Sequence, residues 1–208
     1  MKQKIIDCIT YFQENLQADM RINILFEIVD KFVVCESLYD HRGNKKEVNF
    51  DLKKYNKFGN KVKHIIISDP FPKKNIPWKN QAIQREYIFK GIEEENENDL
   101  IMFSDPDEIP NPQILKDLIL KKKYGIFMQK MFTFKLNFFN QHESPWEGTR
   151  ICKKKDLKSI DWLRQKVVSK NLKYPFWRLD KEKNIQLIHN GGWHFNYLLK
   201  PEEISKKL

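Results

Sequence analysis

The stretch Leu100–Pro110, LIMFSDPDEIP, determines how the rest of the chain is interpreted. Its first four residues are apolar, and a short run of this kind is typical of a buried parallel strand. Three carboxylates follow in Asp105, Asp107 and Glu108, and Asn111-Pro112 then opens a helix with a capping residue and a first-turn proline. Because open α/β sheets bind ligands at the carboxyl ends of their strands, we predict a ligand site at this turn.

The spacing of the carboxylates indicates what the ligand is. Crowded carboxylates repel one another unless a cation lies among them, and hard oxygen ligands suit Mg²⁺ or Mn²⁺. We therefore predict a divalent cation, Mn²⁺ or Mg²⁺, held by Asp105 and Asp107 directly or through water. Alternation along an extended turn points these two side chains the same way, with Pro106 between them. The alternative is an acidic turn whose aspartates only cap the next helix.

The composition is typical of a folded chain, and we expect no membrane-spanning segment. The 208 residues are 40% apolar and 13% aromatic, which is enough for one domain with a substantial core. No apolar run approaches the roughly 20 residues that cross a bilayer, so only peripheral contact with a membrane stays open. Three widely spaced cysteines, Cys8, Cys35 and Cys152, favour buried free thiols in a reducing compartment, and we expect a cytoplasmic protein.

The chain is basic, with 38 lysines and arginines against 28 acidic residues and a net charge of +10. Such a surface attracts nucleic acid, an anionic membrane or a phosphorylated substrate. The aromatic residues lie mainly in apolar runs and are not interleaved with basic residues on an obvious face. We therefore expect no nucleic-acid partner, although a non-catalytic nucleic-acid-binding domain is one alternative.

Apolar runs and helical spacing predict alternating strands and helices in the first half of the chain. The strands are expected at 4–10, 31–36, 62–68 and 100–103, and the helices at 16–29, 51–58, 78–95 and 111–123. A long aromatic run at 124–139 then suggests one bent strand or a hairpin. A polar turn at 140–148, a strand at 149–152, a helix at 156–168, a strand at 184–189 and a helix start at 201–208 complete the expected order.

Several segments, in chain order, resemble glycosyltransferase family 17, and the acidic turn is similar to the metal-binding DxD motif of GT-A glycosyltransferases. The matching segments are Asp7-Cys8, Tyr11–Glu14, Asp19–Ile22, Val34–Ser37, Gln84-Arg85, Ser104–Pro110 and Gly192–Phe195. Gln13 and Asp19 depart from the Asn and Glu usual in that family, and Pro106 lies inside the DxD. The set spans nearly the whole chain, so it is more specific than a lone DxD.

The resemblance implies an α/β fold with a GT-A-like, Rossmann-type mixed sheet flanked by helices. We expect a single domain over 1–208, with a nucleotide-sugar-binding half at about 1–110 and an acceptor-binding half at about 111–208. It also implies an inverting transferase that uses Mn²⁺ to move a sugar, N-acetylglucosamine from UDP-GlcNAc, onto a glycan acceptor. We expect no membrane anchor like that of the animal Golgi enzymes, so their acceptor is not carried over.

Within that resemblance, candidate residues follow for the donor and the metal. Thr10 and Tyr11 are expected to contact the nucleotide base, and Glu36 a ribose or base donor group. Arg85 is expected either to pair with a diphosphate oxygen or to hold Asp105, and an ordinary surface salt bridge is the alternative for it. His194 is expected to complete the metal shell, although a lone histidine is more often a satisfied structural residue.

An inverting transfer also needs a general base within hydrogen-bond reach of the acceptor hydroxyl. Glu147 and Glu108 are the two candidates, and we favour Glu147 because it follows Trp146 in an expected loop. The indole rings of Trp146 and Trp193 are expected to bind acceptor sugars. The alternative is that Glu147 is a solvated loop residue and Trp146 an edge of the core.

One enzymatic alternative is a haloacid-dehalogenase-type, Mg²⁺-dependent phosphatase, which also places DxD after an apolar strand. Its nucleophilic strand usually begins the fold, whereas three expected strands precede the motif here. The later acidic pair that it needs has only Asp156 and Asp161 as candidates, and these follow a lysine run and not an apolar strand.

Overall fold

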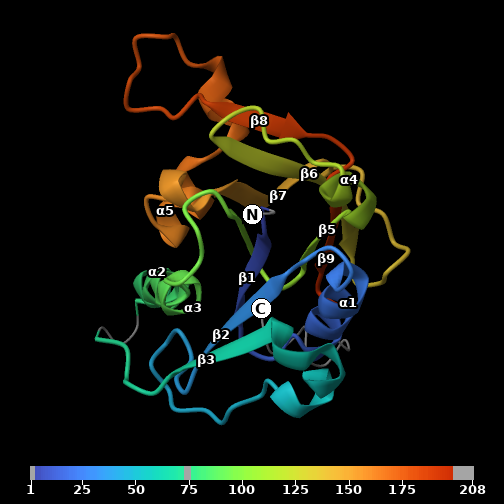
Figure 1. Ribbon diagram of the computed structural model, residues 1–208, viewed down its shortest axis with the longest axis vertical. Coiled ribbons are helices and arrows are strands. Elements are labelled where there is room, and N and C mark those ends of the chain that lie inside the picture. The colour runs from blue at the N-terminus through green and yellow to red at the C-terminus, as the bar shows by residue number, and fades with distance from the viewer. Residues whose placement is uncertain (1–2, 73–75, 199–208) are drawn as a thin grey trace.

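Within residues 3–72 and 76–198, which it describes, the computed structural model of the protein contains a nine-stranded sheet (Figure 1). The strand order is β3-β2-β1-β4-β7-β6-β9-β5, and β8 pairs with β6 outside that path. The strand that precedes the acidic turn, β4 (Leu100–Ser104), lies near the middle of this order and is buried along its whole length. The acidic turn therefore follows a central strand of the sheet.

The first four strands form the parallel part of the sheet. They are β1 (Ile5–Tyr11), β2 (Lys31–Ser37), β3 (Val62–Ile67) and β4. β1 pairs in parallel with β2 and β4, and β2 pairs in parallel with β3. The strands predicted at 4–10, 31–36, 62–68 and 100–103 are confirmed. Near-continuous apolar runs are what strands covered on both faces require, and β1, β2 and β4 are buried along almost their whole length.

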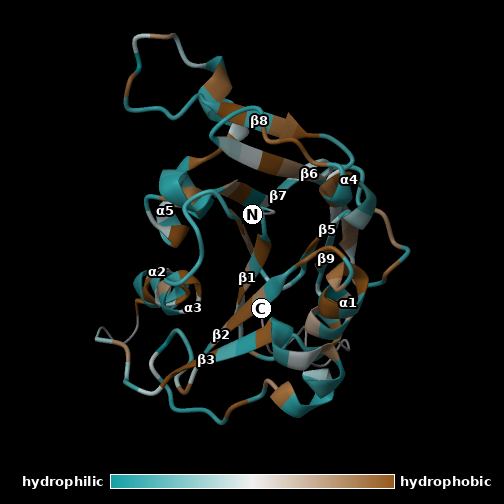
Figure 2. Cartoon of the chain, in the orientation of Figure 1, coloured by the Kyte–Doolittle hydropathy of each residue, from teal (hydrophilic) through white to brown (hydrophobic). Residues whose placement is uncertain are grey.

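Helices cover both faces of the parallel strands. One face of β1, with Ile9 and Tyr11, packs with Ile22 of α1 (Asn15–Leu25). The other face packs against α2 (Pro77–Tyr87), α3 (Phe89–Ile92) and α5 (Ile160–Lys166). Successive side chains of a strand point to opposite faces, so alternate residues of β1 serve two cores. Figure 2 shows the apolar residues concentrated along β1 and β2 between these helices.

The second half of the chain extends the same sheet with antiparallel pairings. β7 (Trp146–Lys153) runs antiparallel between β4 and β6 (Tyr124–Thr133). β8 (Ile185–Ile188) and β9 (Gly192–Asn196) are parallel to β6, and β5 (Glu108–Pro110) is antiparallel to β9. The expected mixed α/β sheet in a single domain is thereby confirmed.

Several predicted boundaries were wrong. The helix predicted at 78–95 is divided into α2 and α3, and the helix at 111–123 ends early as α4 (Pro112–Lys116). The polar turn at 140–148 is shorter than predicted because β7 already begins at Trp146. β5 was missed, since a three-residue strand is too short to show a periodic pattern.

The remaining elements are short. The predicted helix at 51–58 is the 3-10 segment η1 (Leu52–Lys61), and η2 (Lys154–Asp156) and η3 (Ser169–Lys173) are also 3-10 turns. The helix predicted at 156–168 begins later because the Ser159 side chain accepts a hydrogen bond from the backbone N–H of Trp162 and caps α5. The helix start predicted at 201–208 lies outside the described residues.

The structure also bears on two expectations from composition, the state of the cysteines and the presence of membrane-spanning helices. Cys8, Cys35 and Cys152 are buried free thiols, as predicted. Among the residues that the structure describes, none of the helices has the length and apolar character needed to cross a membrane.

Candidate active site

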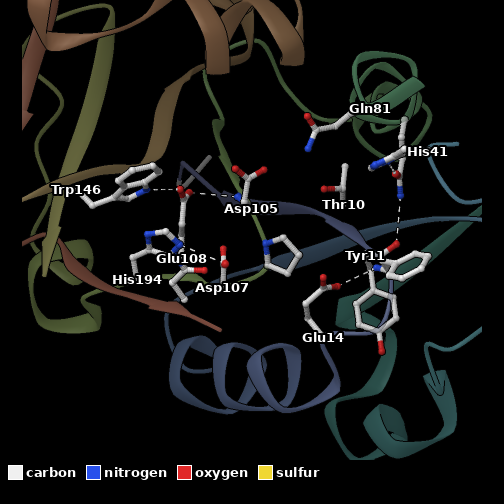
Figure 3. A pocket seen from close by; sticks show the side chains of 14 residues that line it. Thr10, Tyr11, Glu14, His41, Gln81, Asp105, Asp107, Glu108, Trp146 and His194 are labelled. Atoms are coloured by element: carbon white, nitrogen blue, oxygen red, sulfur yellow. Dashed lines mark hydrogen bonds and ion pairs between the residues drawn. The ribbon is translucent and has the colours of Figure 1, made fainter. Parts of the chain in front are cut away.

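A cleft of about 300 Å³ opens where β1 and β4 end (Figure 3). Its walls come from the end of β1, from α2, from the turn between β4 and β5, and from β7 and β9. The lining residues are Thr10, Tyr11, Phe12, Glu14, His41, Gln81, Gln84, Asp105, Pro106, Asp107, Glu108, Trp146, His194 and Asn196. The acidic turn therefore faces the cleft at the carboxyl ends of parallel strands, where ligands are expected to bind.

Asp107 and His194 lie side by side in the cleft and interact. His194 Nε2 lies 3.2 Å from Asp107 Oδ2, and the pairing of β5 with β9 sets Glu108 opposite His194. Burial tends to lower the pKa of His194, but the hydrogen bond and charge of Asp107, with Glu108 and Asp105 behind it, raise that pKa above its ordinary value. The imidazole is thus an electrostatic partner of the acidic turn.

Gly192 allows β9 to approach β5 closely enough for that pair to form. Its φ is +131°, a backbone conformation that L side chains rarely adopt. A Cβ atom at this position would lie 2.1 Å from the carbonyl oxygen of Ile109 and 2.7 Å from the backbone nitrogen of Asn111. The position of His194 therefore depends on the glycine that begins its strand.

Asp105 is held by two arginines and not by His194. Its Oδ2 accepts a hydrogen bond from Arg164 Nη2 at 2.6 Å, and its Oδ1 lies 3.4 Å from Arg85 Nη2. Arg85 in turn donates to Asp161 at 2.8 Å. Burial would raise the pKa of Asp105, but the charges of Arg164 and Arg85 outweigh it and lower that pKa. The carboxylate of Asp105 is therefore ionised and held in one orientation.

Glu108 lies fully buried at the back of the cleft. Its Oε1 accepts hydrogen bonds from the indole Nε1 of Trp146 at 2.8 Å and from Arg164 Nη2 at 2.7 Å. Its Oε2 accepts from the backbone N–H of Asp105 at 3.2 Å. Arg164 thus bridges two carboxylates of the motif, and their charges raise the pKa of its guanidinium further above its already high value, against the effect of burial.

A buried ion pair supports the turn from below. Arg21 of α1 donates two hydrogen bonds of 2.6 Å to Asp7 of β1, and both side chains are almost completely buried. The same guanidinium donates to Ser104 Oγ at 2.7 Å and to the carbonyl oxygen of Glu108. Paired and fully hydrogen-bonded, this arginine joins α1, β1, β4 and β5 at the point where the acidic turn begins.

The opposite end of the cleft contains Thr10 and Tyr11 (Figure 3), and Phe12, which follows them in the chain, also lines the cleft. Gln84 holds this end together, because its Nε2 donates to the carbonyl oxygens of Cys35 at 2.8 Å and Tyr11 at 3.2 Å. Figure 3 shows Trp146, Glu108 and His194 on one side of the two aspartates and Thr10 and Tyr11 on the other. The structure therefore brings the residues expected to contact the base, Thr10 and Tyr11, into the same cleft as the residues expected to hold the metal, Asp105, Asp107 and His194.

Glu36 does not line this cleft. It is fully buried at the end of β2, where its carboxylate accepts hydrogen bonds from Lys46 Nζ at 2.6 Å and from the backbone N–H groups of Asn49 and Phe50. His64 Nε2 lies 3.2 Å from it. These partners attach the polar segment after β2 to the sheet, so this carboxylate, which was expected to contact the donor, has a structural role.

Glu147 and Trp193 also lie outside the residues that line the cleft. Glu147 was predicted to lie in a loop beside Trp146, but both belong to β7, and neighbouring side chains of a strand point to opposite faces. Trp146 faces the cleft, whereas Glu147 accepts a 3.0 Å hydrogen bond from the backbone N–H of Ser169. The same alternation separates Trp193 from His194 in β9.

Sequence reasoning missed Arg164 and Phe12. Arg164 lies in a helix whose spacing gives no sign that it reaches the acidic turn, so no local pattern could have identified it. Phe12 is 38% exposed at the edge of the cleft. A polar-flanked aromatic residue immediately after a strand was a usable signal for it.

The residues of the cleft could supply some, but not all, of the ligands of a divalent cation. No group of three or more His, Cys, Asp and Glu side chains in the described chain forms a ready-made metal site. Asp107 and His194 lie side by side in the cleft, 3.2 Å apart, and a carboxylate and a neutral imidazole can both ligate a divalent cation. Mg²⁺ and similar ions are commonly held by one or two protein ligands together with substrate phosphates and water. Asp107 and His194 are therefore compatible with such an ion.

The fold, with an acidic turn at the carboxyl end of a central strand, is that of the GT-A glycosyltransferases. The chain belongs to glycosyltransferase family 17, whose family model matches residues 1–201. No curated protein matches the sequence.

The chain is similar to solved structures at low sequence identity, and TarS shares its fold. S. aureus TarS, residues 1–349, matches with a TM-score of 0.53 and 14% identity, over 93% of this chain and 60% of that one. Glucosyl-3-phosphoglycerate synthase from Mycobacterium tuberculosis, in complex with Mn²⁺ and UDP-glucose, has a TM-score of 0.49 and 11% identity, over 98% of this chain and 74% of that one. The protein thus spans about 60% of the TarS chain.

Proposed function

We propose that the protein transfers a sugar from a nucleotide-sugar donor to a hydroxyl of a glycan acceptor in a metal-dependent, inverting reaction. The observation that supports this most is the position of Asp105-Pro106-Asp107, which faces a cleft at the ends of β1 and β4 with His194 beside it. Family membership supports the same class of reaction. UDP-GlcNAc is the donor that the family resemblance favours.

The donor is proposed to lie along the cleft. Phe12 offers an exposed ring for the base, and Thr10 and Tyr11 lie beside it. The diphosphate would then reach Asp107 and His194 near the other end. A divalent cation bound there, Mn²⁺ or Mg²⁺, supplies a Lewis acid that neutralises charge on the leaving diphosphate. Arg85 and Arg164 hold Asp105 in place, so its carboxylate does not need to reorganise when the donor binds.

Glu108 is our proposal for the general base, in place of Glu147. Of these two carboxylates, only Glu108 lines the cleft. An inverting transfer is a single displacement in which the acceptor oxygen bonds to the anomeric carbon, the bond to the diphosphate breaks, and the base takes the hydroxyl proton. The ring of Trp146, which donates to Glu108, offers the acceptor sugar an apolar face next to that base.

Donor binding by calorimetry and thermal shift tests the proposal. UDP, GDP and their sugars are titrated with Mn²⁺, with Mg²⁺ and with a chelator. We expect UDP and UDP-GlcNAc to raise the melting temperature only when the metal is present, because a ligand that binds only the folded state stabilises it. Absence of metal-dependent stabilisation by every nucleotide tried would contradict the transferase.

A further inference from the structure

The segment 170–183 comprises most of η3 and the loop that follows it before β8, and it exposes three large apolar side chains among polar neighbours. Phe176 is 83% exposed, Trp177 66% and Leu179 91%. We call these three residues the apolar tip. Figure 1 shows the loop that bears them projecting from the molecule beside β8. Isolated exposed apolar residues are ordinary, but three within four positions on one projecting loop indicate a contact surface.

The loop is shaped by its own hydrogen bonds. The backbone N–H of Arg178 donates to Pro175, and that of Lys181 donates to Arg178, each at 3.1 Å. Lys183 Nζ donates to the carbonyl oxygen of Arg178 at 2.9 Å. The rings of Phe176 and Trp177 meet edge to face with centroids 5.2 Å apart. The apolar tip is therefore presented in a defined conformation, which lowers the entropic cost of binding.

Charge around the tip identifies the kind of partner. The segment 170–183 contains five basic residues, Lys170, Lys173, Arg178, Lys181 and Lys183, against two acidic ones, Asp180 and Glu182, for a net charge of +3. Asp180 is neutralised locally, with Arg178 Nε at 2.7 Å and Lys181 Nζ at 3.1 Å. Tryptophan and phenylalanine next to lysines are the combination that favours the interface of an anionic bilayer.

We propose that the segment 170–183 is a membrane-docking loop that inserts the apolar tip into the interfacial region of an anionic lipid bilayer, with its lysines contacting the lipid headgroups. None of its residues lines the active-site cleft. The proposal is independent of the identity of the donor, the metal and the acceptor.

Vesicle binding by the full chain tests the loop. The protein is mixed at low salt with vesicles of phosphatidylcholine alone or with about 30% phosphatidylserine, and bound protein is separated by flotation. We expect binding only to the anionic vesicles, weakened by salt, with a blue shift of tryptophan fluorescence. The triple variant F176S/W177S/L179S should bind roughly tenfold more weakly or worse.

A matched control removes exposed apolar residues elsewhere. Trp78 and Ile119 are 80% and 72% exposed outside the segment, and the double variant W78S/I119S should bind anionic vesicles like the wild type. Both variants should keep the wild-type melting temperature and metal-dependent nucleotide binding, because the side chains removed are exposed.

Three outcomes would overturn the proposal. The first is no binding of the wild-type protein to anionic vesicles, or equal binding to neutral ones. The second is equal loss of binding in the triple variant and in the control. The third is a concentration-dependent dimer in sedimentation velocity that only the triple variant abolishes, without vesicle binding, which would assign the tip to a contact between two copies of the chain.

Discussion

Arg164 shows how one side chain sets the electrostatics of the cleft. It bridges Asp105 and Glu108 at 2.6 and 2.7 Å, so a single guanidinium keeps two carboxylates of the motif from repelling each other. Removing one partner of a buried ion pair leaves an uncompensated charge, which typically costs about 3–5 kcal/mol.

Replacing Arg164 by methionine is therefore expected to lower turnover by about 100-fold or more, because the two carboxylates lose their orientation. The pKa of Asp105 should rise, since burial then acts with less opposing positive charge. The acid limb of the pH–rate profile should accordingly move to higher pH. Steady-state kinetics over a pH range measure both effects, and R42M, at an exposed arginine, is the control. Wild-type kinetics in R164M would remove Arg164 from the site.

Asp107 is the carboxylate of the motif with the fewest protein partners. Its Oδ2 faces His194, and 27% of its side chain is exposed. The D107A variant is expected to abolish metal-dependent UDP binding and to leave the melting temperature of the unliganded protein within a few degrees of the wild type. Calorimetry with UDP and Mn²⁺ measures the first effect and thermal denaturation the second. D69A, at an exposed aspartate, should bind UDP normally; unchanged binding in D107A would exclude the motif from metal binding.

At the scale of elements, the pairing of β5 with β9 places His194 beside the acidic turn, and Gly192 makes this pairing possible. The G192A variant is expected to lose about 2–5 kcal/mol of unfolding free energy from backbone strain and overlap with Ile109. It should also lose metal-dependent nucleotide binding. Gly59 has a positive φ too, +62°, but open space around it, so G59A should cost only about 1–2 kcal/mol and keep binding. Equal effects of the two substitutions in denaturant unfolding would contradict the close-approach argument.

Strand alternation in β7 separates the two glutamates that were candidates for the base. E108Q is expected to lose turnover by at least about 100-fold while donor affinity changes little, because a base acts on the acceptor proton and not on the donor. E147Q should keep most of the turnover and lose stability, because both carboxylate oxygens of Glu147 accept hydrogen bonds from Ser169 and one lies 3.5 Å from Arg150, whereas glutamine has one acceptor oxygen and no charge. Single-turnover kinetics with donor titration separate the two effects. A turnover defect confined to E147Q would restore Glu147 as the base.

At the scale of the whole molecule, Glu36 makes the fold sensitive to acid. Burial tends to raise its pKa, but hydrogen bonds from His64, Lys46 and the backbone of Asn49 and Phe50 hold that pKa below its ordinary value. Its contribution to stability is therefore present above the pKa of the unfolded chain and is lost as the pH falls through the pKa of the folded state.

The E36Q variant is accordingly expected to unfold about 2–4 kcal/mol more easily at neutral pH, with a smaller difference from the wild type at acid pH. Urea denaturation at several pH values measures this, and E47Q, at an exposed glutamate, should follow the wild-type curve. A loss of stability in E36Q that stays constant with pH would show that packing, and not charge, is responsible.

The fold could be predicted from the sequence more completely than the contacts within the site. The four parallel strands could be predicted because each is a short apolar run between polar breaks, and the acidic turn because it directly follows one of them. Glu147 was placed beside the acceptor on the assumption of a loop, and the strand β7 turns it away. Arg164 was missed because its partners lie about sixty positions earlier in the chain, and no local pattern encodes that contact.

The sequence alone therefore determined the order of the elements, the place of the acidic turn and the family to which the chain belongs. The order of the elements and the place of the turn follow from local patterns of apolar and charged residues, which act over a few neighbouring positions. The family follows from a resemblance in segments spread along nearly the whole chain. Only the tertiary structure decided which charged groups meet: Arg164 with Asp105 and Glu108, His194 with Asp107, and Arg21 with Asp7. The physical reason is that burying charge is costly unless a partner is within hydrogen-bond reach, and the partners come together only when distant strands and helices pack.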